Sequence, residues 1–116
     1  MADFELVVER VLRAVELVPP GEVASYGDIG SVCGVGSRQV GRVMSQWGAD
    51  VPWWRITNAA GDFPEALRTR ALPHWRDEGI AVKPNGRGCR IANHRTDLAV
   101  LATRWHAATT DLPPFD

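Results

Sequence analysis

Tryptophan, cysteine and histidine are the residues whose chemistry could define a site in this sequence, and two tryptophans are neighbours. The stretch DVPWWRITNAAGDFP, residues 50–64, places Trp53 and Trp54 between a proline and Arg55. Neighbouring side chains of an extended segment point to opposite sides, so one indole can line a cavity while the other packs into the core. Both could instead be core residues. The alternative is an aromatic wall for a flat ligand, such as a base removed from its stack.

The cysteines and histidines do not form a catalytic or metal-binding pattern. Cys33 follows Ile29 and Val32 on the apolar side of a predicted short helix, and we interpret it as a small buried hydrophobic residue. Cys89 lies in a predicted strand with basic neighbours, where it could be exposed. We expect both thiols to be reduced. No metal and no cofactor is expected, because the histidines are scattered: His74, His94 and His106.

Length and composition indicate one domain of 116 residues, of which 45% are hydrophobic. No apolar run approaches the ~20 residues of a membrane span. Acidic residues near the N-terminus argue against an export signal, so we expect a cytoplasmic, nucleoid-associated protein. The net charge of −1 argues against a strong nonspecific grip on nucleic acid but allows a local basic face. Lys83 is the only lysine, and arginine is better suited to planar recognition.

Two short helices joined by a glycine-containing turn are predicted in the N-terminal half. The first ends at Gly34, and a tight turn leads to a second helix that Ser37 can cap and Gly48 ends. This is the helix-turn-helix pattern. It occurs in proteins that read nucleic acid and also as a plain packing unit, and the pattern alone leaves both possibilities open.

The segments around this motif are less regular. An amphipathic helix is predicted over residues 3–18, with Asp3 as N-cap, and residues 51–63 are expected to be extended or loop-like. A further helix opens at Pro64 and runs to residue 78, with Pro73 as a break or a new first turn.

The C-terminal part is predicted to contain a β-hairpin and a final helix. Residues 79–92 form the hairpin, with Asn85-Gly86 as its turn. Residues 93–110 form one helix with a buried face, and residues 111–116 are expected to be a loose tail. The buried face of this helix is expected to carry Leu98, Leu101, Ala102 and Trp105.

Three stretches in order, PGEVASYGDI, GSRQVGRVM and VPWWRI, resemble the DNA-binding domain of O6-alkylguanine-DNA alkyltransferases and, more closely, the alkyltransferase-like proteins. The resemblance covers about residues 3–80. It implies an α+β, mainly helical fold with a winged-helix-like helix-turn-helix. We therefore predict a DNA-binding domain over residues 1–80, and residues 81–116 as a C-terminal extension, with its small hairpin and helix, packed on the same domain.

The resemblance also implies that the residues needed for alkyl transfer are missing. The family's active-site signature, Pro-Cys-His-Arg-Val, is here Pro52-Trp53-Trp54-Arg55-Ile56, so indoles replace both the thiol nucleophile and its histidine. Alkyl transfer depends on a thiolate, whereas an indole offers only a weak N–H donor. Glu78 matches the family's glutamate but is expected to have nothing left to relay to. The resemblance thus implies a protein that is not an enzyme.

DNA-binding residues follow from the same resemblance. Tyr26 matches the tyrosine that helps to rotate the target nucleotide out of the duplex, and Arg38 matches the arginine that fills the vacated place. The helix over residues 37–47 is expected in the minor groove, which carries little sequence information. Gly41 would permit a close approach of the backbone. Phosphates or groove edges could be contacted by Ser37, Gln39 and Arg42.

The lesion pocket is expected around the tryptophans. Trp53 would form the wall beside the alkyl group, and Arg55 would hold the loop through hydrogen bonds. An arginine after the motif is expected to face the lesion base, and Arg68 and Arg70 are the nearest candidates. The shape of the pocket would be completed by Val51, Pro52 and Trp54.

These expectations combine into one function and two alternatives. The first is a monomeric, non-enzymatic sensor that binds O6-alkylguanine in double-stranded DNA, flips the lesion base and recruits nucleotide excision repair proteins. The second is a helix-turn-helix transcription regulator that reads a defined site, independent of damage. The third is an enzyme with Cys33 or Cys89 as a relocated alkyl acceptor.

Overall fold

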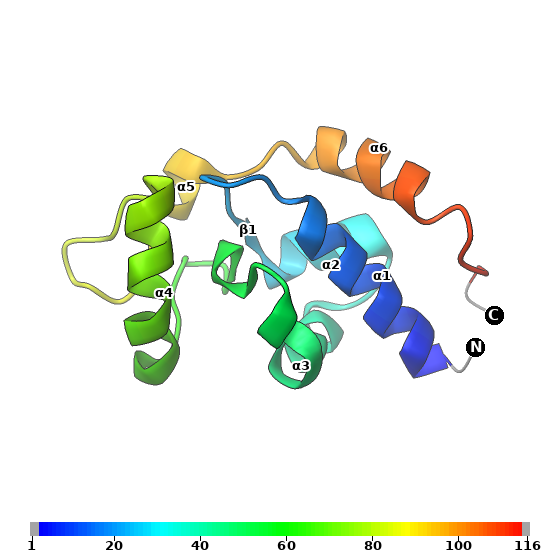
Figure 1. Ribbon diagram of the computed structural model, residues 1–116, viewed down its shortest axis with the longest axis horizontal. Helices are drawn as coiled ribbons and strands as arrows, with labels where there is room; N and C mark the ends of the chain where they lie inside the picture. The colour runs from blue at the N-terminus through cyan, green and yellow to red at the C-terminus, as the bar shows by residue number, and fades with distance from the viewer. Residues whose placement is uncertain (1–2, 115–116) are drawn as a thin grey trace.

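Short helices dominate the computed structural model, which describes residues 3–114. Figure 1 shows α1 and α6 side by side, with α4 at the opposite end of the molecule from the two termini. The expectation of a mainly helical α+β fold is confirmed. The elements are α1 (Asp3–Leu17), β1 (Ala24–Ser25), α2 (Tyr26–Cys33), α3 (Ser37–Trp47), the 3-10 helices η1 (Gly48–Asp50) and η2 (Trp53–Arg55), β2 (Ile56–Thr57), α4 (Glu65–Glu78), α5 (Ile91–His94) and α6 (Leu98–Ala108).

The first helix ends one residue before the predicted boundary, and its apolar side packs against α2, α3 and α6. Val11, Ala14 and Val15 are completely buried. Asp3, the predicted N-cap, is instead the first helical residue that the structure describes. Its charge lies in the first turn, where the helix dipole favours an acid.

The helix-turn-helix consists of α2 and α3. At its start, Ser25 Oγ accepts from the Asp28 amide at 3.1 Å, and Asp28 Oδ2 accepts from the Ser25 amide at 3.0 Å. This reciprocal capping box satisfies two amides that a helix start would otherwise leave unpaired. Gly34 ends α2 with a φ of 74°, as predicted. The turn also needs Gly30, because a Cβ there would lie 2.5 Å from the Val35 carbonyl oxygen.

The second helix has its predicted bounds, Ser37–Trp47, but its N-cap differs from the prediction. Ser37 is the first residue of α3, and Gly36, which has no side chain to cap the helix, is its N-cap; the Gly36 amide donates to Gln39 Oε1 at 3.3 Å. Gly48 has a right-handed conformation, with a φ of −79°, so the chain continues into η1. Gly48 is thus the C-cap of α3, as predicted, and the chain then tightens into a 3-10 turn.

The fourth helix continues through Pro73, contrary to the predicted break. A proline removes one helical hydrogen bond, whose acceptor would be the carbonyl of Thr69. Both residues lie on the exposed face of α4, where water can solvate that carbonyl. The buried face carries Ala71 and Trp75, and packing of this face holds the helix together.

A small parallel sheet joins β1, which leads into α2, to β2, which follows η2. Ala24 of β1 pairs with Ile56 of β2, and Ser25 pairs with Thr57. All four residues are buried. The segment expected to be loop-like thus contains a short strand, which fixes η2 and its tryptophans relative to the start of α2.

The C-terminal part differs most from prediction. The hairpin is reduced to a single antiparallel bridge between Val82 and Cys89. Its turn runs from Lys83 to Gly86, whose amide donates to the Lys83 carbonyl at 2.9 Å, so Pro84 and Asn85 occupy the centre instead of Asn85-Gly86. Proline favours the first central position of such a turn.

The predicted helix over residues 93–110 is interrupted. Asp97 caps α6 by accepting from the amides of Ala99 and Val100, so the helix starts afresh at Leu98. Leu101 and Trp105 are buried as predicted, whereas Leu98 and Ala102 are only half-buried. Trp105 Nε1 donates to the Arg10 carbonyl at 2.9 Å, which ties α6 to α1.

Part of the segment that was expected to be a loose tail contacts α1. Arg13 of α1 pairs with Asp111 at 2.6 Å, and Arg10 donates to the Pro113 carbonyl at 3.0 Å. Residues 115–116 lie outside the described range. The division of the chain at residue 80 stays a prediction. None of the helices described between residues 3 and 114 is long and apolar enough to cross a membrane.

Buried hydrophobic residues form two clusters. The main core lies between α1, α2, α3 and α6 and is built almost entirely from aliphatic side chains, with Trp105 at its edge. The second, which we call the aromatic cluster, lies under α4. Its buried members are Val23, Phe63, Ala71, Trp75, Ile80 and Cys89, with Trp53 and Trp54 packed against them.

Candidate DNA-binding face and lesion pocket

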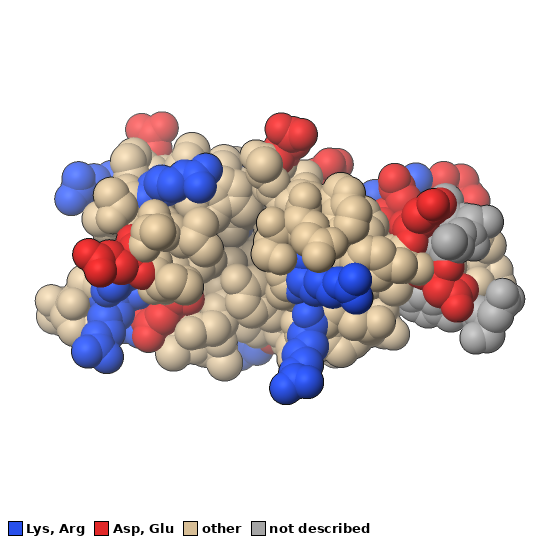
Figure 2. Space-filling model, turned by 90° about the horizontal axis from the view of Figure 1, so that it is seen from below, with Lys and Arg blue, Asp and Glu red and all other residues tan. Residues whose placement is uncertain are grey.

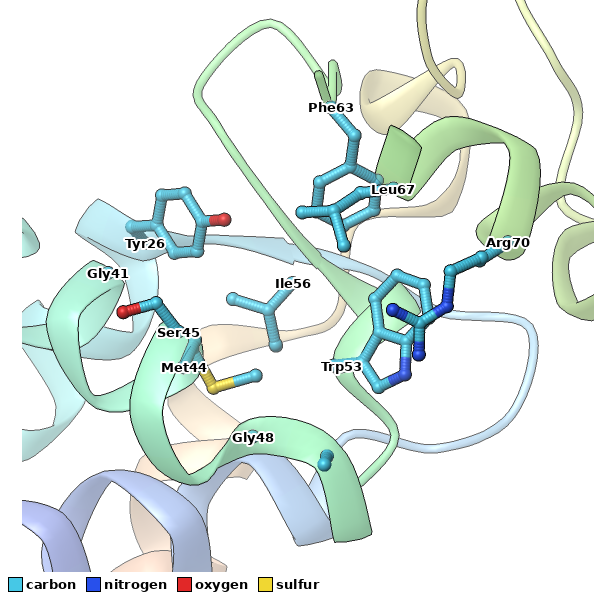
Figure 3. Close-up of a pocket in the computed structure, with 11 residues that line it drawn as sticks. Tyr26, Gly41, Met44, Ser45, Gly48, Trp53, Ile56, Phe63, Leu67 and Arg70 are labelled. Atoms are coloured by element: carbon cyan, nitrogen blue, oxygen red, sulfur yellow. The ribbon is translucent and has the colours of Figure 1, made fainter. Parts of the chain in front are cut away.

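A cavity of about 300 Å³ opens between α3 and α4, at the lower end of the range of small-molecule sites. Figure 3 shows side chains from α2, α3, η2, β2 and α4 around it. Its wall is mostly apolar, with one guanidinium and two hydroxyl groups. The lining residues are Tyr26, Gly41, Met44, Ser45, Gly48, Ala49, Trp53, Ile56, Phe63, Leu67 and Arg70.

Trp53 forms one wall of this pocket and is fixed by its neighbours. Its ring meets Phe63 edge-on at 5.7 Å and Trp54 at 6.0 Å, and both contacts are favourable aromatic geometries. The Arg70 guanidinium lies 5.5 Å from the centre of the Trp53 ring, in the range of a cation–π contact. The indole is therefore oriented before any ligand arrives.

The opposite wall comes from one face of α3. Gly41, Met44, Ser45 and Gly48 recur at helical spacing and so face the same side. A Cβ at Gly41 would meet no atom within 4 Å, so this glycine is not required by packing inside the protein. It leaves open space where a nucleotide backbone could approach.

Tyr26 lies at the start of α2, and its half-buried ring borders the pocket (Figure 3). Burial raises the pKa of its phenol above the ordinary value of 10.0. The hydroxyl therefore stays protonated at neutral pH, and it can donate a hydrogen bond to an anionic oxygen.

Glu78 is the centre of a hydrogen-bond network behind the pocket wall. Its carboxylate accepts from Trp54 Nε1 at 2.7 Å, from Arg55 Nε at 2.9 Å and Nη2 at 2.8 Å, and from the Gly21 amide at 2.9 Å. Glu78 therefore holds Trp54, Arg55 and Gly21 together, whereas the expectation that it has nothing left to relay to stays a prediction. Burial opposes the charge of Glu78, but the bonds from Arg55, Gly21 and Trp54 outweigh it and lower the carboxyl pKa below its usual value.

Trp54 belongs to this network and not to the pocket lining. Its ring stacks on His74 at 3.7 Å, and its carbonyl accepts from Trp75 Nε1 at 2.8 Å. The two neighbouring indoles thus have different surroundings, as predicted, although they lie in the 3-10 helix η2 and not in the extended segment that the alternation argument assumed. Trp53 faces the cavity, whereas Trp54 anchors η2 to α4.

Four other predicted pocket residues also lie outside the lining. Val51 is buried in the main core, and Arg55 binds Glu78 and the Val18 carbonyl, at 3.0 Å, in agreement with its predicted structural role. Pro52 precedes η2 without reaching the cavity, and Arg68 is half-buried on α4. Of the two candidate arginines, only Arg70 lines the pocket.

The predicted DNA-contacting residues of α3 are exposed. Arg38 and Arg42 lie one helical turn apart, and the Arg42 guanidinium rests 4.4 Å from the centre of the Phe4 ring. Figure 2 shows basic side chains projecting over α3 and over α4, with a hollow between the two groups. Ser37 and Gln39 are also exposed at the start of the helix, and the roles of all four stay predictions.

Sequence reasoning missed several residues of the pocket. The helical spacing from Gly41 could have identified the α3 wall, because Met44, Ser45 and Gly48 follow at three-, four- and seven-residue steps. Ile56, Phe63 and Leu67 had no such signal. They come from a strand, a loop and a helix, and only the tertiary fold brings them together.

Neither cysteine has the surroundings of a reactive thiol. Cys33 is 1% exposed, as its interpretation as a buried residue predicted, and Cys89, which could have been exposed, is fully buried. Burial raises the pKa of Cys33 to about 12 and that of Cys89 to about 11. Both thiols are therefore protonated and inert at neutral pH. Within residues 3–114, no cluster of three or more acidic, histidine or cysteine side chains could hold a metal ion.

Comparison with known proteins agrees with this geometry. Residues 7–80 match the family described as 6-O-methylguanine DNA methyltransferase, DNA binding domain. A "DNA base-flipping protein" of Escherichia coli (strain K12) is 33% identical over 86 residues, which are 67% of this chain and 65% of the relative. A protein of the same description from Shigella flexneri matches equally. The chain thus spans just under two thirds of the length of these relatives.

Solved structures give the same relationship. S. pombe Atl1 in complex with damaged DNA containing O6-carboxymethylguanine superposes with a TM-score of 0.70 at 26% identity. A second structure of S. pombe ATL in complex with DNA gives a TM-score of 0.66, also at 26% identity. Each match covers 84% of this chain and 99% of the other.

The chain belongs to the family of the 6-O-methylguanine DNA methyltransferase DNA-binding domain, because the match covers more than half of it. The predicted resemblance to the alkyltransferase-like proteins is also confirmed, by the base-flipping relatives and by the Atl1 structures.

Proposed function

We propose that this protein is a non-enzymatic sensor of O6-alkylguanine in double-stranded DNA. It flips the lesion base into the pocket between α3 and α4 and marks it for nucleotide excision repair. The observation that carries the proposal is the preformed cavity beside the helix-turn-helix, with Trp53 as one wall. A flat base stacks favourably on an aromatic side chain, at about 1–3 kcal/mol per base.

The position of the pocket supports base flipping. Tyr26 and α3 border the same cavity as Trp53, so the groups that would extrude a nucleotide are next to the space that would receive it. Arg38, exposed in the first turn of α3, is free to enter the stack in place of the lost base. Extrusion costs a few kcal/mol, and a side chain that restores stacking offsets part of this cost.

The absence of alkyl transfer follows from the chemistry of the site. Trp53 stands at the position of the family's reactive cysteine, and an indole has no thiolate equivalent. Both thiols of the chain are buried and protonated, which argues against a relocated acceptor. Mass spectrometry after incubation with alkylated DNA should therefore detect no alkyl gain on the protein.

Arg70 is the residue that we propose to face the lesion base. Its guanidinium already lies against Trp53 in the pocket, whereas Arg68 does not line it. Arg70→Gln should reduce the preference for the lesion, and Arg68→Gln, an equal charge change two residues away, should leave it unchanged. An equal loss in both variants would assign the effect to net charge instead.

The decisive experiment is a paired binding and transfer assay on one duplex. We expect tighter binding to DNA with a single O6-methylguanine than to the unmodified duplex, and the methyl group should persist after incubation. Equal affinity for both duplexes would remove the sensor function. Loss of the methyl group, with unmodified guanine restored in the duplex, would show that the protein is an enzyme.

A transcription regulator is the alternative, and the same duplexes distinguish it. A regulator would protect a defined sequence regardless of damage, whereas a sensor should protect the region around the lesion in any sequence. Recruitment of repair proteins can be tested in bacterial cells without their own alkyltransferases. Protection from an alkylating agent should require intact nucleotide excision repair. The monomeric state and the cytoplasmic, nucleoid-associated location stay predictions.

A further inference from the structure

A segment of the C-terminal part pairs with the strand that leads into the helix-turn-helix. The Val23 amide donates to the His94 carbonyl at 2.9 Å, and the Thr96 amide donates to the Val23 carbonyl at 2.8 Å. Arg95 thereby forms a parallel bridge with Val23, one residue before β1. The backbone of Arg95 is thus fixed beside the start of α2, although about seventy positions separate the two in the chain.

The side chain of Arg95 adds a second contact with the start of α2, through Asp28. Its Nε donates to Asp28 Oδ2 at 3.0 Å, and its Nη2 donates to Asp28 Oδ1, so the pair is bidentate. The Asp28 side chain is 7% exposed, whereas that of Arg95 is 54% exposed and covers it from the solvent side. Such forked pairs restrict the geometry more than single hydrogen bonds do.

The same carboxylate also caps α2. Asp28 Oδ2 accepts from the Ser25 amide as well as from Arg95. Burial opposes the charge on Asp28, but the bonds from Arg95 and Ser25 outweigh it and lower the carboxyl pKa below its usual range. Without Arg95, this charge would be buried with one partner fewer, and the carboxylate would gain by turning towards water.

Tyr26 lies between the two residues of this cap. It is the first residue of α2, directly after Ser25, and its ring borders the pocket. The backbone angles of Ser25 and Tyr26 set the direction of the Tyr26 side chain, and the capping box holds these angles. A shift of the cap would therefore move the phenol relative to the DNA.

We propose that Arg95 is a positioning residue for Tyr26 during base extrusion, acting through Asp28 and the cap of α2. The inference rests on the proposed function and gives the C-terminal part a role in lesion recognition. Arg95 does not line the pocket. Its contribution should therefore concern the flipped complex and not the first contact with the groove.

Arg95→Gln tests this, with affinities measured for the O6-methylguanine duplex and for the unmodified duplex. We expect the preference for the lesion to fall about five- to tenfold, while binding of the unmodified duplex changes little. In a Tyr26→Ala background, the same substitution should have no further effect, because the two residues act as one unit. Arg95→Lys, which can keep one of the two bonds, should restore part of the preference.

Arg13→Gln is the matched control. It removes the same charge and releases the Asp111 end of the C-terminal part, but Arg13 lies on α1, away from the cap. This variant should retain the wild-type preference. The proposal is overturned if Arg95→Gln also retains it, or if the effects of Arg95→Gln and Tyr26→Ala simply add. Equal binding of both duplexes by the unaltered protein would instead overturn the proposed function, and the inference with it.

Discussion

The main core and the aromatic cluster bury their side chains in different ways. The main core is nearly all aliphatic, and its members cover one another completely between α1, α2, α3 and α6. The aromatic cluster contains tryptophans whose indole N–H groups form hydrogen bonds. One of these bonds reaches the charged side chain of Glu78, which also binds Arg55. One region holds the helices together, whereas the other holds one indole beside an open cavity. The main core should therefore stabilise the fold without shaping the pocket, whereas the aromatic cluster should do both.

The Glu78 network should give the largest effect, and it tests how strongly the aromatic cluster depends on one charge. Glu78→Gln leaves Arg55 without its carboxylate, and both side chains are only 12% exposed. Removing one partner of a buried pair costs about 3–5 kcal/mol. Urea denaturation should show a loss near the lower end of this range. Glu16→Gln, an exposed acid on α1, is the control and should change little.

Leu101→Ala in α6 should destabilise the fold by about 3 kcal/mol, because it leaves a cavity in the main core, where Leu101 is buried. At a temperature at which the variant stays folded, its preference for the lesion duplex should equal that of the unaltered protein. A loss of preference would show that the main core also shapes the pocket, and the separation of the two regions would fail.

Trp53→Ala should have the opposite effect to Leu101→Ala: a large loss of lesion binding with a smaller loss of stability. The side chain is a pocket wall, so its removal should weaken lesion binding by about 30-fold, as expected for an aromatic hot spot of about 2 kcal/mol. Thermal unfolding should shift less than in Leu101→Ala. Trp47→Ala is the control: that indole is 44% exposed at the end of α3 and contacts Phe4 outside the pocket. Similar binding losses in both variants would contradict the assignment of Trp53.

The smallest expected effect concerns how the stability of the fold depends on pH in acid. The pKa of Glu78 is lowered in the folded protein, so its ionised form stabilises the fold. This contribution is complete above the ordinary value of 4.5 and is lost as the pH falls through the lower value of the folded state. Stability measured against pH should therefore decline less steeply in acid for Glu78→Gln. Parallel curves would mean that Glu78 does not supply the acid dependence.

Local sequence signals predicted the elements that local interactions determine. The bounds of α1 and α3 and the end of α2 followed from apolar spacing and from two glycines, Gly34 and Gly48, because helices of this kind are specified within a few residues. Pro73 and Asn85-Gly86 misled prediction. Their preferred conformations were overridden by packing of the buried face of α4 and by the turn that Pro84 begins.

The site was predictable only in part. Trp53, at a motif position, and Arg70, one of two candidate arginines, were expected in the pocket and line it, and Tyr26 and Gly41, which were expected to contact DNA, line it too. Trp54 was assigned to the pocket but belongs to the network of Glu78, more than twenty residues away in the chain. No spacing within one element could have indicated that pair.

The amino-acid order is enough to determine the helix-turn-helix and to predict, by resemblance, an indole in place of the family's sulfur nucleophile, since both depend on residue types at short spacing. The tertiary fold alone decided that Trp53 faces the cavity, that Arg70 and not Arg68 reaches it, and that Arg95 closes the cap of α2. These outcomes depend on distances between elements. Such distances are set by the packing of both clusters, and they leave no periodic trace in the sequence.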